Sequence, residues 1–267
     1  MGRYAPAWRR AGYRIFDSIF LRRTGRTPDG EFDIYVSPGC QLNVLDPRGV
    51  PIDPVHRRFI DRWISATSVI WDIGTNMGLF AFPAALRARN GQVYGFEPDI
   101  DLVRQVTRSL RRVRNMDLHL SIFGFALSDT DGASEFLIAR YGRSMNKLEG
   151  AGPWHDGLFV GSEKRWVATL SMDTMAKYLR PPEVIKIDVE GAEMKVLEGG
   201  RATIAKHRPV MLVEGPMELW EDMSRFYRDL DYVYYDGSLE EPILLGEPTW
   251  DTVAVPREKW EKHPLMA

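Results

Sequence analysis

An apolar run that ends in an acid and is followed by two glycines constrains this chain more than any other feature. Residues 69–71 are apolar, Asp72 follows them, and Gly74 and Gly78 come next. A second, mostly apolar run at 93–96 ends at Glu97. Glycine lets a backbone approach a ligand closely, and a carboxylate after the second strand can accept hydrogen bonds from both ribose hydroxyls. The pattern predicts a strand–turn–helix–strand unit that binds a nucleoside.

The spacing of the glycines separates two classes of nucleoside cofactor. Turns that hold a diphosphate follow the pattern G-x-G-x-x-G and leave backbone amides free for the phosphates. Here an acid opens the turn and Asn76 lies between the two glycines. A carboxylate repels a diphosphate but attracts an ammonium or sulfonium group. S-adenosylmethionine is therefore the favoured cofactor, and a nicotinamide-dependent oxidoreductase is the alternative.

Composition sets the broad class of the protein. The chain has 267 residues, 44% hydrophobic and 27% charged, which is enough for one large domain with additions. A net charge of −2 provides no field that would recruit nucleic acid, so we predict no nucleic-acid partner. Cys40 is the only cysteine, which excludes an intrachain disulfide. No signal peptide and no run of roughly 20 apolar residues is visible, so we expect a cytoplasmic protein.

From residue 65 onward the pattern alternates between strands and helices. Runs such as 184–187 and 209–213 are apolar almost throughout, which is typical of parallel strands buried on both faces. Two late candidates, 232–235 and 252–255, would close the edge of the sheet. We predict strands ending near Ile73, Phe96, Leu127, Ile187 and Val213, and helices over 79–89, 100–114, 192–206 and 217–230.

The first 64 residues are predicted to form an extension to a domain that spans 65–267. Arginines and apolar residues recur at helical spacing near the N-terminus, which predicts a basic amphipathic helix. That helix could cap the sheet, contact a second subunit of a homodimer, or lie on an anionic membrane as a peripheral anchor. Alternation over 31–45 around Ser37-Pro38-Gly39 predicts a hairpin, and 54–65 a helix. The glycine-rich stretch 140–164 is predicted to be a substrate loop.

Four acids follow strands of the predicted sheet: Asp72, Glu97, Asp188 and Glu214. Ligands of open parallel sheets bind beyond the carboxyl ends of the strands, so these acids predict a site along one rim. Any one of them could instead cap a helix.

Two further residue types bear on the chemistry of this rim. An oxygen cluster of Asp188, Glu190 and Glu193 would suit Mg²⁺ or Ca²⁺, but acids are common at a helix start, and we predict no metal. His155, in the glycine-rich stretch, is a candidate general base or an exposed loop residue. The other histidines have no sequence context that indicates a function: His56, His119, His207 and His263.

Several ordered blocks together resemble the FkbM-type S-adenosylmethionine-dependent methyltransferases. The blocks span roughly residues 65–215. The resemblance implies a class I methyltransferase fold, which is a Rossmann-like, seven-stranded, mostly parallel sheet with helices on both faces and a reversed last strand. It also implies O-methylation of a hydroxyl on a sugar, glycoconjugate or natural product. The blocks are Asp72–Gly78, Phe96–Asp99, Ala126–Asp129 with Gly132, Ile185–Glu193, Val196–Gly199 and Pro209–Glu214.

The resemblance also implies roles for single residues. Asp72, Gly74, Asn76 and Gly78 would form the turn around the methionine half of the cofactor, and Glu97 would bind the ribose. Phe125, Ala126 and Leu127 would border the adenine. Asp188 would reach the point of methyl transfer, and we take Asp188, His155 and Glu214 as catalytic candidates. The chain departs from the family in having Thr75 where alanine is usual. A non-catalytic, cofactor-binding adaptor is the remaining alternative.

Overall fold

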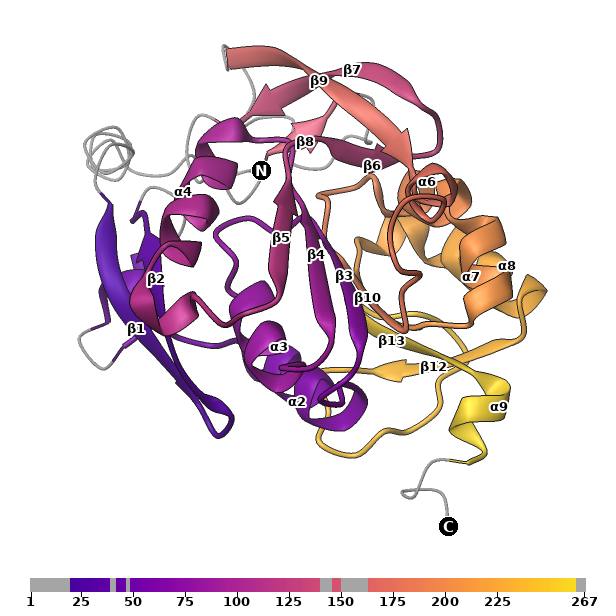
Figure 1. Cartoon of the computed structure of the whole chain (residues 1–267). Helices are drawn as coiled ribbons and strands as arrows, with labels where there is room; N and C mark the ends of the chain where they lie inside the picture. Colours follow the sequence, from indigo (N-terminus) through magenta and orange to yellow (C-terminus); the bar gives the residue numbers. More distant parts are fainter. Residues whose placement is uncertain (1–19, 39–41, 47–48, 140–145, 150–162, 263–267) are drawn as a thin grey trace, which may run out of the picture.

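The computed structural model describes residues 20–38, 42–46, 49–139, 146–149 and 163–262. Its centre is a seven-stranded sheet in the order β12-β13-β11-β10-β3-β4-β5 (Figure 1). All strands run parallel except β13, which is antiparallel to both of its neighbours. This confirms the predicted class I fold and the two late strand candidates, of which β12 lies at the edge and β13 beside it. The strand bounds are β3 Val69–Ile73, β4 Gln92–Phe96, β5 Leu120–Phe123, β10 Val184–Ile187, β11 Val210–Glu214, β12 Tyr232–Asp236 and β13 Asp251–Pro256.

Helices cover both faces of this sheet (Figure 1). Alternate strand residues point to opposite faces, so Ile70 and Leu212 join one hydrophobic cluster while Trp71 and Met211 join the other. Helices α2 (Pro54–Trp63), α3 (Ala81–Arg87) and α4 (Ile100–Leu110) pack on the first face. Helices α6 (Glu193–Gly199), α7 (Arg201–His207) and α8 (Trp220–Asp229) pack on the second. The shorter helices are η1 Leu42–Leu45, η2 Val113–Asn115, α5 Met172–Met175, η5 Met217–Leu219 and α9 Arg257–Trp260.

The N-terminal hairpin is present but lies earlier in the chain than predicted. Strands β1 (Leu21–Thr27) and β2 (Gly30–Val36) pair with Thr27 opposite Gly30, so the turn is at 28–29. The predicted hairpin over 31–45 was wrong: β2 does carry the alternating apolar residues, but its partner precedes it, and 42–45 forms η1 in place of a second strand. The hairpin packs outside α3 and α4, where Phe32 stacks on Phe82 at 5.6 Å. The predicted basic helix lies mostly outside the described residues.

A second, four-stranded sheet contains the residue that we had predicted to end a strand of the main sheet. Leu127 is on β6 (Ala126–Ser128), whereas the main-sheet strand is β5, which ends at Phe123. The second sheet has the order β6-β9-β7-β8 and lies above the carboxyl ends of β4 and β5 in Figure 1. Its other strands are β7 Gly132–Ile138, β8 Lys147–Leu148 and β9 Glu163–Ser171. Parts of the predicted 140–164 loop therefore belong to strands, while 140–145 and 150–162 lie outside the described residues.

The predicted helix over 192–206 is two helices that break at Gly200. A Cβ on Gly199 would lie 2.0 Å from the carbonyl oxygen of Ser128, and one on Gly200 would lie 2.6 Å from the sulfur of Met172. Close packing against the backbone of β6 therefore requires Gly199, while Gly200 leaves room for the Met172 side chain of α5. Because consecutive glycines weaken a helix, the element ends where that packing demands them.

Candidate functional site

The site begins where β3 and β10 lie side by side. After β3 the chain continues to β4 on one side of this pair, and after β10 it continues to β11 on the other side. In doubly wound sheets, ligands bind in the crevice that opens where the strand order reverses in this way. Gly74 follows β3 with φ of +82°, and a Cβ there would lie 1.8 Å from the carbonyl oxygen of Asp188. Only glycine fits both restraints, so the ends of the two strands meet at this residue.

The turn after Gly74 is tied to the end of β4. Asn76 has φ of +52°, which asparagine tolerates better than most residues. The Glu97 carboxylate accepts hydrogen bonds from the amides of Asn76 and Asp99, both at 2.8 Å. Burial raises the pKa of Glu97 to about 8 although these two amides oppose the shift. Gly78 ends the turn with φ of +89°.

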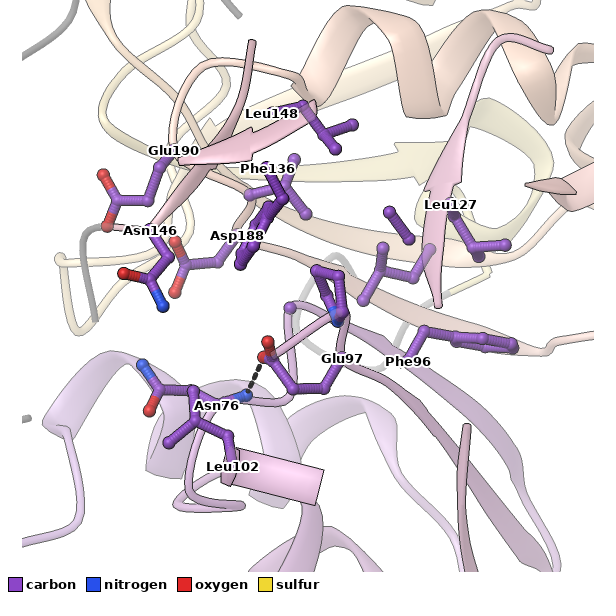
Figure 2. A pocket seen from close by; sticks show the side chains of 15 residues that line it. Asn76, Phe96, Glu97, Leu102, Leu127, Phe136, Asn146, Leu148, Asp188 and Glu190 are labelled. Carbon is purple, nitrogen blue, oxygen red and sulfur yellow. Dashed lines mark hydrogen bonds between the residues drawn. The ribbon is translucent and has the colours of Figure 1, made fainter. Parts of the chain in front are cut away.

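A cavity of about 550 Å³, including the solvent at its mouth, opens over this turn. Figure 2 shows Asp188 and Glu190 on the side of the cavity away from Phe96 and Leu127. One part of the lining is thus apolar and another is acidic. The lining residues are Ile73, Gly74, Asn76, Phe96, Glu97, Pro98, Leu102, Ala126, Leu127, Phe136, Asn146, Leu148, Asp188, Val189 and Glu190. We refer to this space as the nucleoside cavity.

The second sheet supplies one wall of the nucleoside cavity. Asn146 donates from Nδ2 to Asp99 at 3.0 Å and accepts from the amide of Ala139 at 2.7 Å. Arg165 on β9 forms ion pairs with Asp99 and Asp101 at 3.3 and 3.2 Å. These bonds connect the second sheet to the start of α4. Three residues of this wall could not be found from the sequence because no local motif marks them: Phe136, Asn146 and Leu148.

The residues of the nucleoside cavity fit S-adenosylmethionine. Glu97 lines the cavity and can accept hydrogen bonds from ribose hydroxyls, while Leu102, Ala126 and Leu127 offer apolar contact to a base. Asp188 and Glu190 would attract the cationic methionine end. Burial, together with the nearby charges of Asp188, Glu193 and Glu214, raises the pKa of Glu190 to about 8. A cation bound nearby would relieve that repulsion.

A second cavity, of about 850 Å³ including open solvent, adjoins the first. It shares Gly74, Asn76 and Asp188 with the nucleoside cavity, so the two meet at the ends of β3 and β10. We refer to this second space as the acceptor cavity. The remaining residues of its lining are Pro51, Ile52, Asp53, Pro54, His56, Thr75, Leu79, Phe80, Lys186 and Glu214.

Two pairs of charged or polar groups line the acceptor cavity. Lys186 Nζ lies 3.0 Å from an Asp188 oxygen, and its side chain is only 4% exposed. His56 Nε2 lies 2.9 Å from Glu214 Oε1. Burial opposes the charge on Lys186, but Asp188, Glu214 and Asp72 raise its pKa above the usual range. The sequence indicates no role for His56, because its partner is 158 positions away and no local spacing connects the two residues.

Asp72 lies beneath this junction and lines neither cavity. Its two carboxylate oxygens are buried and have no hydrogen-bond partner among the described residues. Burial raises the pKa of Asp72 to about 6 against the opposing charge of Lys186. Thr75, the departure from the family, donates a hydrogen bond to the Asp72 carbonyl at 2.9 Å. The larger Thr75 side chain is accommodated because position 95 on the adjacent strand is glycine.

Two other residues singled out from the sequence, Phe125 and Glu193, lie outside the cavity linings. Phe125 packs on Phe96 at 5.8 Å and is not in the cavity lining. Glu193 accepts hydrogen bonds from the amides of Val189 and Gly191, both at 3.1 Å, so it stabilises the start of α6. His155 lies outside the described residues. No cluster of three His, Cys, Asp or Glu side chains suited to a metal ion occurs in the part of the chain that the structure describes.

The sheet order is that of a class I methyltransferase. Residues 72–234 match the methyltransferase FkbM domain, and the chain belongs to this family of S-adenosylmethionine-dependent methyltransferases. This membership favours methyl transfer over both the nicotinamide-dependent alternative and the non-catalytic one.

Similar proteins include two methyltransferases and one solved structure. The chain is 27% identical over 177 residues to 2-O-methyltransferase NoeI of Sinorhizobium fredii, covering 62% of this chain and 71% of NoeI. It is 29% identical over 136 residues to hexuronic acid methyltransferase AglP of Haloferax volcanii, covering 49% of each chain. The crystal structure of methyltransferase FkbM from Methylobacillus flagellatus gives a TM-score of 0.47 at 17% identity, covering 72% of this chain and 44% of that one.

We predict that Glu97→Gln weakens the binding of S-adenosylhomocysteine. Glutamine offers one acceptor oxygen where glutamate offers two, and leaving a buried donor unsatisfied costs about 1–3 kcal/mol, so the affinity should fall by roughly 5- to 100-fold in isothermal titration calorimetry. Glu247→Gln, at an exposed position, is the control and should bind as the wild type does. Unchanged affinity in Glu97→Gln would remove Glu97 from the ribose site.

The raised pKa values predict that the ligand-free protein loses stability as pH rises. Glu190 ionises at about pH 4.5 when unfolded but at about pH 8 when folded, so the folded state holds the extra proton between these values. Stability contributed by this proton is full below pH 4.5 and is lost as pH rises through 8. Glu190→Gln should therefore reduce the fall in melting temperature between pH 6 and 8 by about a few °C. An equal fall in melting temperature in the wild type and in Glu190→Gln would contradict the raised pKa of Glu190.

Proposed function

We propose that this protein transfers a methyl group from S-adenosylmethionine to a hydroxyl of a sugar or a sugar-containing molecule. The observation that carries the proposal is the junction of the two cavities at Gly74, Asn76 and Asp188. A donor bound in the nucleoside cavity and an acceptor bound in the other would meet there. The names of the relatives NoeI, a 2-O-methyltransferase, and AglP, a hexuronic acid methyltransferase, support a sugar acceptor.

Bound S-adenosylmethionine supplies a methyl group on a cationic sulfur. An oxygen that attacks the methyl carbon in line displaces the sulfur as the leaving group. The protein's own contribution is mainly to position the acceptor oxygen behind that methyl group. Asp188 is at the junction, and Lys186 fixes its carboxylate at 3.0 Å. We assign to Asp188 the role of orienting the acceptor: its carboxylate would accept a hydrogen bond from a hydroxyl of the acceptor. The polar lining of the cavity suits a ligand with several hydroxyls.

Partners and location remain predictions. No helix in the described ranges is long and apolar enough to span a bilayer. A homodimer or a peripheral membrane contact through the basic N-terminal segment would involve residues outside those ranges. The cytoplasmic location expected from the sequence is likewise a proposal.

The substrate class can be tested with a panel of methyl glycosides that covers neutral hexoses, 6-deoxyhexoses and uronates. We expect S-adenosylhomocysteine to form with at least one glycoside and mass spectrometry to find a base-stable methyl ether. A base-labile ester on the uronates would show carboxyl methylation instead. Tight binding of S-adenosylmethionine with no methylated glycoside would contradict a sugar acceptor.

Asp188→Asn should lower turnover of the accepted glycoside strongly while leaving affinity for S-adenosylhomocysteine within a few-fold. Asparagine keeps the shape of aspartate but loses the charge that holds Lys186, so the acceptor would be oriented less well. Turnover is measured by release of S-adenosylhomocysteine and affinity by calorimetry. Asp117→Asn, at an exposed position, is the control. If cofactor affinity falls instead, Asp188 belongs to the cofactor site alone.

A further inference from the structure

A histidine–carboxylate pair lies in the wall of the acceptor cavity. His56 is in the first turn of α2, and Glu214 is the last residue of β11. His56 Nε2 and Glu214 Oε1 are 2.9 Å apart. Both side chains line the cavity that meets the nucleoside cavity at Asp188. The pair is therefore next to the point where a methyl group would be transferred.

The surroundings hold the His56 ring in place. Asp53 caps α2 by accepting a hydrogen bond from the amide of Val55 at 2.7 Å, which fixes the turn that carries His56. The ring of Phe80 packs edge-on against the imidazole at 5.4 Å and 75°. The side chains of His56 and Glu214 are 14% and 21% exposed. The imidazole is thus shielded from bulk water but accessible from the cavity.

The bond to Glu214 determines which ring nitrogen can accept a proton. Burial would raise the pKa of the Glu214 carboxyl, but the hydrogen bond to His56 and the charge of Lys186 outweigh burial and lower it. Glu214 is therefore a carboxylate near neutral pH and can only accept. In a neutral imidazole the proton then belongs on Nε2, and Nδ1 keeps its lone pair.

Asp188 is less suited to take a proton than His56. Protonation of Asp188 would remove the charge that pairs with Lys186, and would leave an ammonium that is 4% exposed without that partner. Breaking a buried ion pair in this way is costly. Protonation of His56 has the opposite effect, because the imidazolium forms an ion pair with Glu214.

We propose that His56 is the catalytic base of this enzyme and that Glu214 is its positioning residue. This inference rests on the proposed transfer to a hydroxyl. The acceptor oxygen forms a bond to the methyl carbon while the carbon–sulfur bond breaks and its electron pair stays on sulfur. The hydroxyl proton passes to Nδ1 of His56 and later to solvent. Product and S-adenosylhomocysteine both leave uncharged at the reacting atoms.

Several charged groups act on the imidazole besides Glu214. They come from the strands packed against α2 and from the turn before it. Most are acids and would stabilise the imidazolium that forms as the hydroxyl is deprotonated. The groups are Asp53 before α2, Asp72 on β3, Lys186 and Asp188 at the end of β10, and Asp251 on β13.

The first test is kinetic and uses a methyl glycoside accepted in the panel above. General base catalysis contributes roughly 10²- to 10⁴-fold, so His56→Asn should lower kcat by at least about 100-fold. KM and affinity for S-adenosylhomocysteine should stay within a few-fold, and the acidic limb of the kcat–pH profile should disappear. His207→Asn is the control. Retention of kcat within about threefold, or loss of the acidic limb in Asp188→Asn instead, would overturn the proposal.

The second test needs no acceptor and examines Glu214. Nitrogen-15 NMR of the histidine rings should show His56 with its proton on Nε2 in the wild type and a mixture of tautomers in Glu214→Gln. Glu218→Gln, four positions further along the chain, is the control. A proton on Nδ1 in the wild type would overturn the proposal even if no glycoside is methylated. If no glycoside is methylated but the NMR result is as expected, the sugar acceptor is contradicted and the proposed pairing of His56 with Glu214 is not.

Discussion

The site depends on the close approach of two neighbouring strand ends. Gly74 and Asp188 follow β3 and β10, and no side chain larger than hydrogen fits at position 74. Because these strands lie where the sheet reverses its order, the crevice above them is open on both sides. One side becomes the nucleoside cavity and the other becomes the acceptor cavity. A single backbone contact thereby fixes how the two ligands would meet.

The charges around that contact explain the choice of donor. Glu97, Asp188, Glu190 and Glu214 line the two cavities, and Lys186 is the main buried cation opposite them. Burial, and to a lesser degree repulsion from neighbouring acids, raises the pKa of Glu97 and Glu190, which means that negative charge on these groups is unfavourable in the ligand-free site. A cationic methyl donor relieves this repulsion, whereas a diphosphate would increase it.

The walls of the two cavities come from different parts of the chain. The second sheet supplies Phe136, Asn146 and Leu148 to the nucleoside cavity, and residues 51–56 supply one side of the acceptor cavity. Residues 51–56 precede the segment that matches the family, which begins at residue 72. The family segment thus provides most of the lining of the nucleoside cavity, and the segment before it provides part of the lining of the second cavity, His56 included.

The sequence by itself determined the sheet, the turn and the nature of the donor, because these depend on local patterns. Asp72, Gly74 and Glu97 are recognisable from the apolar runs that precede them, and the last two strands follow from their own apolar runs. The sequence misplaced the hairpin turn and the strand at Leu127, since alternation shows that a segment is extended but not which segment it pairs with. Only the tertiary structure joined His56 to Glu214 and Asn146 to Asp99, because packing brings distant residues together without leaving a spacing in the sequence.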